Sequence, residues 1–140
     1  MALLDELNGI LSTAGVASSS GESGWYLALG LLPDSTVWPD KTVALIQTQG
    51  YAPEASVEID KPSFQVLTRG ESVMQTSTAY QVAEAKAYQV HTTLHAITPG
   101  AYSSRQYPGI WAEQTPFFLG FDESDRPVFS QNFRTMRSRT

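Results

Sequence analysis

Residues 62–90, PSFQVLTRGESVMQTSTAYQVAEAKAYQV, decide the fold that we predict for this chain. In the first part, 63–69, the residues alternate, so that Phe64, Val66 and Thr68 share one face, as is typical of a strand. A glycine then ends the strand. The second part has the spacing of a helix, so the segment predicts a strand followed directly by a long helix.

The helix is predicted over Ser72–His95. Ser72 with Gln75 three residues later has the form of a capping box, which marks a helix N-terminus. Apolar residues recur at steps of three and four and form one continuous seam. The seam consists of Tyr80, Ala83, Ala87, Val90 and Leu94. The small alanines in it allow close approach to a sheet or another helix, and Pro99-Gly100 lies beyond the helix end.

The remaining segments predict one more helix and several strands. Residues 1–15 carry an apolar stripe and form an N-terminal helix, and 16–24 is small and polar, which predicts a flexible loop. Residues 25–32 begin the body as a strand or a short helical piece. Further strands are expected at 42–47, 57–60, 110–114, 117–121 and 128–136, and an acid-rich turn at 122–127. The order predicts an α+β fold: a mixed, largely antiparallel sheet with two helices packed on one face.

Composition favours a single domain over 1–140, with 25–140 holding the sheet and the long helix. The 140 residues include no cysteine, which excludes disulfides and thiolate metal sites. No apolar run is long enough for a membrane span. Acidic residues near the N-terminus, Asp5 and Glu6, argue against a signal peptide, so we expect a mature, non-exported sequence.

Charge is unevenly distributed along the chain. The net charge is −5, with nine basic and fourteen acidic residues. Four of the basic residues lie from Arg126 onward, where there is no acid, so the first 125 residues carry −9. An acidic body does not attract nucleic acid, because phosphate binding needs a basic patch. The basic tail is interpreted as a solvated strand end; contact with phosphate or an acidic neighbour is the alternative.

Candidate chemistry is sparse. His91 and His95 lie four residues apart and would share a helix face, as helical zinc sites require. Thr92 stands where a metalloprotease has its glutamate base, so an enzyme using both histidines with a carboxylate such as Glu113 is only the alternative hypothesis. No phosphate loop, nucleophile elbow or dinucleotide fingerprint occurs. We therefore predict no catalytic, cofactor-binding or metal-binding residues, no cofactor and no enzyme activity.

Tyr102 and Tyr107 bracket the loop after the long helix. Aromatic side chains of this kind anchor cores or interfaces, and a core with a subunit interface is the preferred interpretation. A monomeric module that binds a peptide or small ligand in an apolar pocket near these tyrosines remains an alternative.

A set of short motifs, in order, resembles the minor capsid and tail terminator (tail completion) proteins of long-tailed bacteriophages, over Leu27 to Arg137. The N-terminal motifs are Leu32-Pro33-Asp34, Pro39-Asp40, Val43–Ile46, Gly50, Pro62–Val66, Arg69-Gly70 and the helix that ends in Leu94-His95. The C-terminal motifs are Pro116, Leu119-Gly120, Asp122-Glu123, Arg126 and Asn132-Phe133.

The resemblance implies a structural virion protein, made in the host bacterial cytoplasm. It implies a homo-oligomeric ring, usually of six subunits, at the head-proximal end of the tail. The ring would cap the tail tube, end its polymerisation and join the tail to neck or head–tail connector proteins, while genomic DNA passes through the lumen without sequence-specific binding. A neck or head-completion connector of related fold is the alternative.

A ring of wedge-shaped subunits makes head-to-tail contacts that close, and Arg69 at the strand end would suit an ion pair with a neighbouring subunit. An ordinary surface arginine is the alternative for Arg69. The complete set of candidate interface residues is Arg69, Trp38, Asp40, Tyr102, Tyr107, Arg126 and Arg134.

Overall fold

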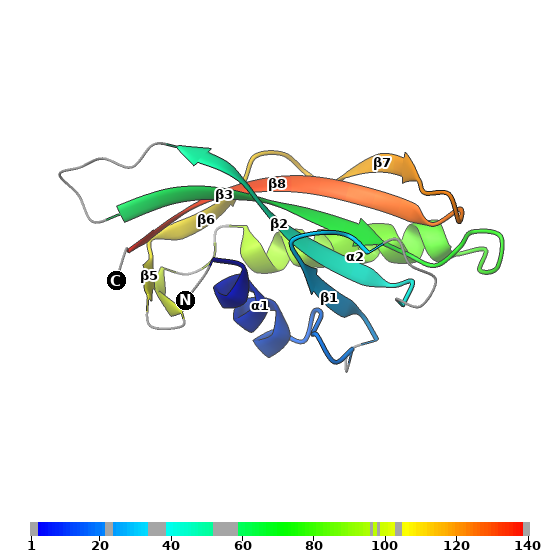
Figure 1. Cartoon of the computed structure of the whole chain (residues 1–140), viewed down its shortest axis with the longest axis horizontal. Coiled ribbons are helices and arrows are strands. Elements are labelled where there is room, and N and C mark those ends of the chain that lie inside the picture. The colour runs from blue at the N-terminus through cyan, green and yellow to red at the C-terminus, as the bar shows by residue number, and fades with distance from the viewer. Residues whose placement is uncertain are drawn as a thin grey trace.

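The computed structural model describes residues 3–21, 24–33, 39–51, 59–95, 97, 99–102 and 105–138. These ranges hold two helices and eight strands (Figure 1). In chain order they are α1 (Leu3–Thr13), β1 (Tyr26–Leu29), β2 (Thr42–Tyr51), β3 (Ile59–Arg69), α2 (Ala79–Leu94), β4 (Gly100–Tyr102), β5 (Arg105–Tyr107), β6 (Gly109–Ala112), β7 (Phe117–Phe121) and β8 (Pro127–Ser138). The predicted α+β class is confirmed.

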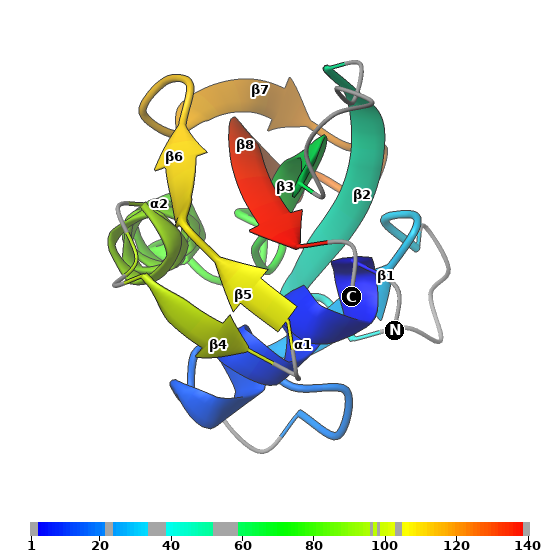
Figure 2. The ribbon, with the colours of Figure 1, turned by 90° about the vertical axis from the view of Figure 1, so that its left-hand side faces the viewer.

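The main sheet has six strands in the order β1-β2-β3-β8-β6, with β7 also paired to β8. Strands β1 and β2 are parallel, whereas the other pairs in this sheet are antiparallel. The prediction of a mixed, largely antiparallel sheet is therefore correct. Both helices lie on the same side of the sheet, below it in Figure 1. Strands β4 and β5 form a separate antiparallel pair, which Figure 2 shows lying across α1.

Strand β8 organises the sheet because it is paired along both edges. One edge pairs with β3. The other edge pairs with β6 through its C-terminal half and with β7 through its N-terminal half. Strands β6 and β7 thus follow one another along β8 as two parts of a broken edge, and both positions agree with the sequence prediction.

Strand β3 is one long strand where the sequence predicted two. Its described part runs without a break from Ile59 through Pro62 to Arg69; positions 57 and 58 of the predicted first strand lie outside the described residues. The register with β2 shifts between Thr48 and Tyr51, opposite the proline. Gly50 permits this shift, since a Cβ there would lie 2.4 Å from the carbonyl oxygen of Lys61.

Helix α2 begins at Ala79, seven residues later than the predicted Ser72, and the predicted capping box is wrong. Oγ of Ser72 accepts a hydrogen bond from the amide of Met74, and Thr78 at the N-cap makes no side-chain capping bond. The amide of Val73 donates to the carbonyl of Asp125 in the turn after β7. The local hydrogen bond to Ser72 competes with helix formation. The bond from Val73 to Asp125 then holds residues 72–78 in turns.

The apolar seam of α2 is correct. Its alanines at 83 and 87, together with Val90 and Leu94, are buried at 0–1% exposure. On the sheet, Phe64 and Phe133 are register partners whose rings stack at 5.1 Å. Helix α1 contributes its own stripe to the same core: Leu3, Leu7 and Leu11. No described helix is both long and apolar enough to cross a membrane.

The loop after α1 is packed on the body where it is described. Val16 and Ala17 are each 1% exposed and belong to the core. Ser18 forms a parallel bridge with Tyr26 at the start of β1. The open choice for residues 25–32 is settled in favour of a strand.

Candidate functional site

Arg69 lies at the end of β3 and holds the segment before β2. Its side chain is buried, with the residue 1% exposed. The guanidinium donates to the carbonyl oxygens of Asp40 (3.1 Å), Pro39 (3.0 Å) and Pro33. Thr42 donates its hydroxyl hydrogen to the same Pro39 oxygen at 2.8 Å. Arg69 is therefore not the ordinary surface arginine of the alternative interpretation, because its guanidinium is buried and donates to carbonyl oxygens of its own chain.

Arg126 is the second buried arginine of this end of the sheet. Its Nε donates to the Asp122 carboxylate at 2.7 Å, and one of its two terminal guanidinium nitrogens donates to the Asp40 carboxylate at 3.1 Å. Burial alone would lower the pKa of Arg126, but the hydrogen bonds and charges of Asp122 and Asp40 outweigh it, and the net pKa is raised. Asp122 also accepts from the amides of Ser124 and Arg126, which confirms the turn predicted at 122–127.

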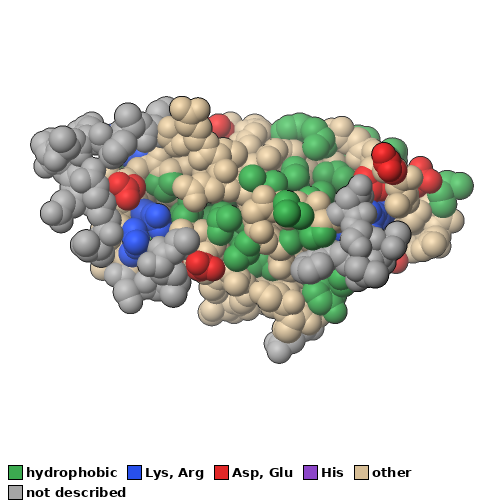
Figure 3. Space-filling view, in the orientation of Figure 1, with side chains coloured by type: hydrophobic (Ala, Val, Ile, Leu, Met, Phe, Trp, Pro, Cys, Tyr) green, Lys and Arg blue, Asp and Glu red, His purple; other side chains and the backbone are tan. Residues whose placement is uncertain are grey.

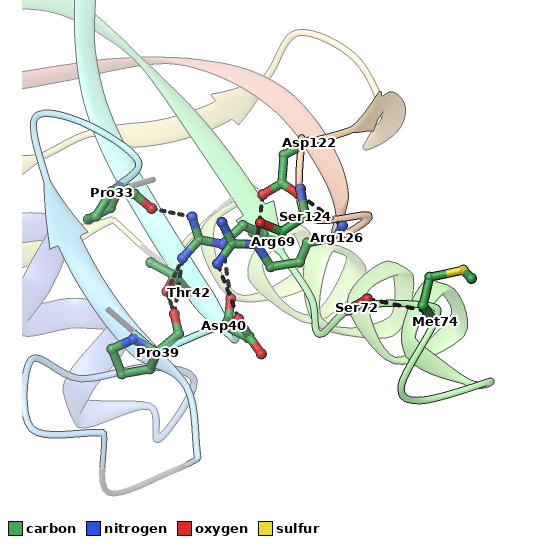
Figure 4. Close-up of polar contacts among 10 residues, drawn as sticks. All are labelled: Pro33, Pro39, Asp40, Thr42, Arg69, Ser72, Met74, Asp122, Ser124 and Arg126. Carbon is green, nitrogen blue, oxygen red and sulfur yellow. Dashed lines mark hydrogen bonds and ion pairs between the residues drawn. The ribbon is translucent and has the colours of Figure 1, made fainter. Parts of the chain in front are cut away.

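Asp40 joins the two arginines, as Figure 4 shows. Its backbone carbonyl accepts from Arg69 and its carboxylate accepts from Arg126. The carboxylate side chain keeps 43% exposure, whereas the Arg126 side chain keeps 4%. The three residues thus form a structural cluster in which Asp40 offers its carboxylate to solvent.

A second buried cluster surrounds Glu6 of α1, which is 0% exposed. Its Oε1 accepts from Tyr107 at 2.5 Å and from Arg137 at 2.6 Å. Arg105 lies 3.3 Å from Oε2. Burial, with the hydrogen bond and charge of Glu6, raises the pKa of Tyr107 above its ordinary value. From the sequence, Glu6 served only as an argument against a signal peptide, because its neighbours in the chain give no sign that it is buried.

The two candidate tyrosines lie together on the β4–β5 pair. The rings of Tyr102 and Tyr107 meet edge to face, with centroids 5.8 Å apart. Tyr107 is 1% exposed and belongs to the core, and Tyr102 is partly buried against it. Two hollows elsewhere in the described part of the chain, around Trp111 and around Asn132, are lined by neither tyrosine.

Arg134 lies on the sheet face opposite the helices. It is exposed, and its guanidinium carbon lies 6.0 Å from the ring centre of Trp111 on β6. Together with Lys61 these residues line an open hollow of about 360 Å³. Among the candidate interface residues, Arg134 is thus an exposed cation, while Trp38 lies outside the described residues.

One histidine of the pair, His95, has a structural role. His91 and His95 stack with ring centroids 5.2 Å apart. Nδ1 of His95 accepts a hydrogen bond from the amide of Ala112 at 2.9 Å. Within the described ranges no group of three or more histidine and acidic side chains is placed to hold a metal ion.

Strand β7 carries a feature that the sequence analysis missed. Its sequence is FFLGF, and Phe117, Phe118, Leu119 and Phe121 are each between 39% and 57% exposed. The sequence itself indicated this exposure, because the segment lacks the polar residues that alternate with apolar ones in a strand with one solvated face. Figure 3 shows exposed apolar side chains across the middle and upper margin of the molecule.

A family model and solved structures resemble this chain. A family model described as "Bacteriophage tail terminator protein" matches residues 8–138. A solved chain from the "Virion of native gene transfer agent (GTA) particle" has a TM-score of 0.57 and 13% identity, covering 98% of this chain and 92% of that chain. Another solved chain has a TM-score of 0.51 and 11% identity, with 95% and 92% covered. No curated protein matches.

Proposed function

Since this chain belongs to the bacteriophage tail terminator family, a family of phage tail structural proteins, we propose that it caps the tail tube. In this role it binds the head-proximal end of the tube, stops addition of further tube subunits and presents a surface to neck or head–tail connector proteins. It works without enzyme activity or cofactor. The observation that carries the proposal is the family match over 8–138, nearly the whole described body.

The capping form that we propose is a closed ring of identical copies, six by resemblance to the family. Closed rings need head-to-tail contacts between two different surfaces of each subunit. The exposed apolar strand β7 supports a role in assembly, because monomeric proteins rarely leave such a segment open.

The charge of the chain supports a lumen through which DNA passes. Six copies at −5 would carry about −30 in total. A conduit for DNA should repel phosphate and not grip it. We therefore propose no sequence-specific contact with the genome.

The test adds purified chain to polymerising tube protein from the same virus and measures tube length by electron microscopy. We expect shorter tubes with extra density at one end, in proportion to the amount of chain added. Binding to the head connector with no effect on tube growth would favour the neck-connector alternative instead. Tubes of unchanged length and bare ends would overturn the proposal.

A further inference from the structure

Strand β7 is an open edge of the main sheet. One side of it pairs with β8, and the other side has no partner among the described strands. Leu119 is 57% exposed and Phe117 is 42% exposed. Edge strands of soluble proteins are normally blunted by charge, proline or a cover, because they otherwise associate. Within β7 there is no charged residue and no proline.

The opposite edge of the sheet is β1, and it is also apolar. Leu29 at its end is 39% exposed and Leu31 just beyond it is 59% exposed. Ser18 covers the first part of this edge, because its carbonyl accepts from the amide of Leu27. The part of this edge that stays open to another molecule is therefore the end of β1, around Leu29 and Leu31.

The two edges lie at the same level of the sheet. Successive register partners form one row from β1 to β7: Ala28, Ala44, Leu67, Ser130 and Phe117. A second row runs parallel to it: Tyr26, Thr42, Arg69, Val128 and Gly120. The five strands of each row, both edges included, make four spacings, so the two edges lie roughly 19 Å apart at the usual strand spacing.

The directions of the strands suit contact between identically oriented copies. Strand β1 runs parallel to β2, and the steps to β3, β8 and β7 are each antiparallel. Strand β7 therefore runs opposite to β1. A second copy placed beside the first in the same orientation brings its β1 edge antiparallel to β7, which is the relation a head-to-tail ring repeats.

Charge is complementary between the same two edges. At the start of β1, the ammonium groups of Lys41 and Lys86 lie 5.6 and 5.4 Å from the ring centre of Trp25. Burial and the nearby Lys41 lower the pKa of Lys86, as expected for two cations held close together. At the corresponding end of β7, the turn carries exposed Glu123 and Asp125.

We infer that the β7 edge of one copy packs against the β1 edge of the next copy. Phe117, which is level with Ala28, lies beside the exposed end of β1. Leu119 meets the segment around Ser18 that covers Leu27, and the acidic turn meets the lysines beside Trp25. This contact rests on the proposed function, because it supplies the subunit interface of the capping ring.

Cross-linking tests the pairing of edges directly, because the chain has no cysteine of its own. The variant Leu29→Cys/Leu119→Cys, treated with a short bismaleimide, should give a ladder of covalent oligomers. Each single-cysteine variant should give no ladder. Efficient dimers from Leu119→Cys alone would show β7-to-β7 contact and would overturn the inference, as would a double variant that stays monomeric.

Sedimentation of purified protein measures the strength of the contact. Leu119→Asp should weaken self-association about tenfold or more, because it places a charge in an apolar contact. Tyr88→Asp is the matched control, since Tyr88 is 45% exposed on α2 and its ring lies near His91, a residue outside the proposed contact. Equal loss in both variants with unchanged circular dichroism would count against the β7 contact, as would a wild-type chain that remains monomeric at high concentration.

A charge exchange tests the polar part. Lys41→Glu and Glu123→Lys should each weaken association several-fold at low salt, and the two changes in one chain should restore it, because each contact would then carry the reversed pair. Glu84→Lys on α2 controls for net charge. Failure of the double variant to recover would overturn the charge pairing. If chains with these substitutions still cap tubes through another subunit contact, this interface is overturned and the proposed function stands.

Discussion

Tyr107 and Glu6 lie 101 residues apart in the sequence and share a 2.5 Å hydrogen bond, in which the phenol donates to Oε1. Arg137 of β8 binds the same carboxylate oxygen at 2.6 Å. One buried carboxylate thus fixes α1 to β5 and to the end of β8. Because its contacts come from three separate parts of the chain, it is a sensitive point for the stability of the fold.

Glu6→Gln should lower the free energy of unfolding by about 3 kcal/mol, because it leaves two arginines beside a neutral group in a buried site. Urea unfolding measures the change. Asp5→Asn is the matched control, since Asp5 is exposed on the same helix, and it should change stability by less than about 0.5 kcal/mol. Similar values for the two variants would contradict the buried cluster.

Tyr107 should make stability fall at alkaline pH. The pKa of its phenol is raised in the folded chain, chiefly by burial, whereas the unfolded value is about 10. Above about pH 10 the unfolded state therefore binds fewer protons than the folded state. The contribution of Tyr107 to the free energy of unfolding is then lost with a slope of up to about 1.4 kcal/mol per pH unit. Tyr107→Phe should remove this part of the slope, and parallel pH curves for the two proteins would exclude it.

Arg69→Lys should destabilise the chain by about 2 kcal/mol, because an ammonium group lacks the planar fork that reaches three carbonyl oxygens. Thermal and urea unfolding provide the measurement. Arg134→Lys, on the exposed face, should be nearly neutral. If Arg69 acted only between subunits, its substitution would change association and leave the stability of the monomer intact.

Gly70→Ala should destabilise by about 1–3 kcal/mol through overpacking. A Cβ at this position would lie 2.9 Å from Cβ of Ala83 on α2. Adding Ala83→Gly removes that methyl group, so the double variant should lose less than the sum of the single changes. Strict additivity in this double-mutant cycle would show that α2 does not approach the sheet at Gly70.

Local patterns predicted most of the fold. The positions of β7 and of the turn after it followed from short-range signals, and the seam of α2 followed from its spacing. The start of α2 did not, because the amide of Val73 is fixed by a carbonyl more than fifty residues away. A capping pattern reports local preference only, and tertiary bonds override it.

The candidate site was harder to predict for the same reason. Arg69 and Arg126 were recognised as notable arginines, but their burial depends on carbonyl and carboxylate groups from a distant segment around Asp40. Sequence spacing contains no measure of such long-range partners. The apolar edge at β7, by contrast, is formed by consecutive residues, FFLGF. It could have been recognised from the sequence by asking which of these side chains the fold would cover.

Strand β8 is the last described strand to be synthesised, yet it lies inside the sheet. While the ribosome is still making residues 70–126, β3 has one edge without its neighbour, and β6 and β7 have no strand to pair with. Such non-local pairing makes folding slow. Nascent chains therefore cannot present a finished β7 edge, so copies become competent to join one another only after their final strand has been inserted.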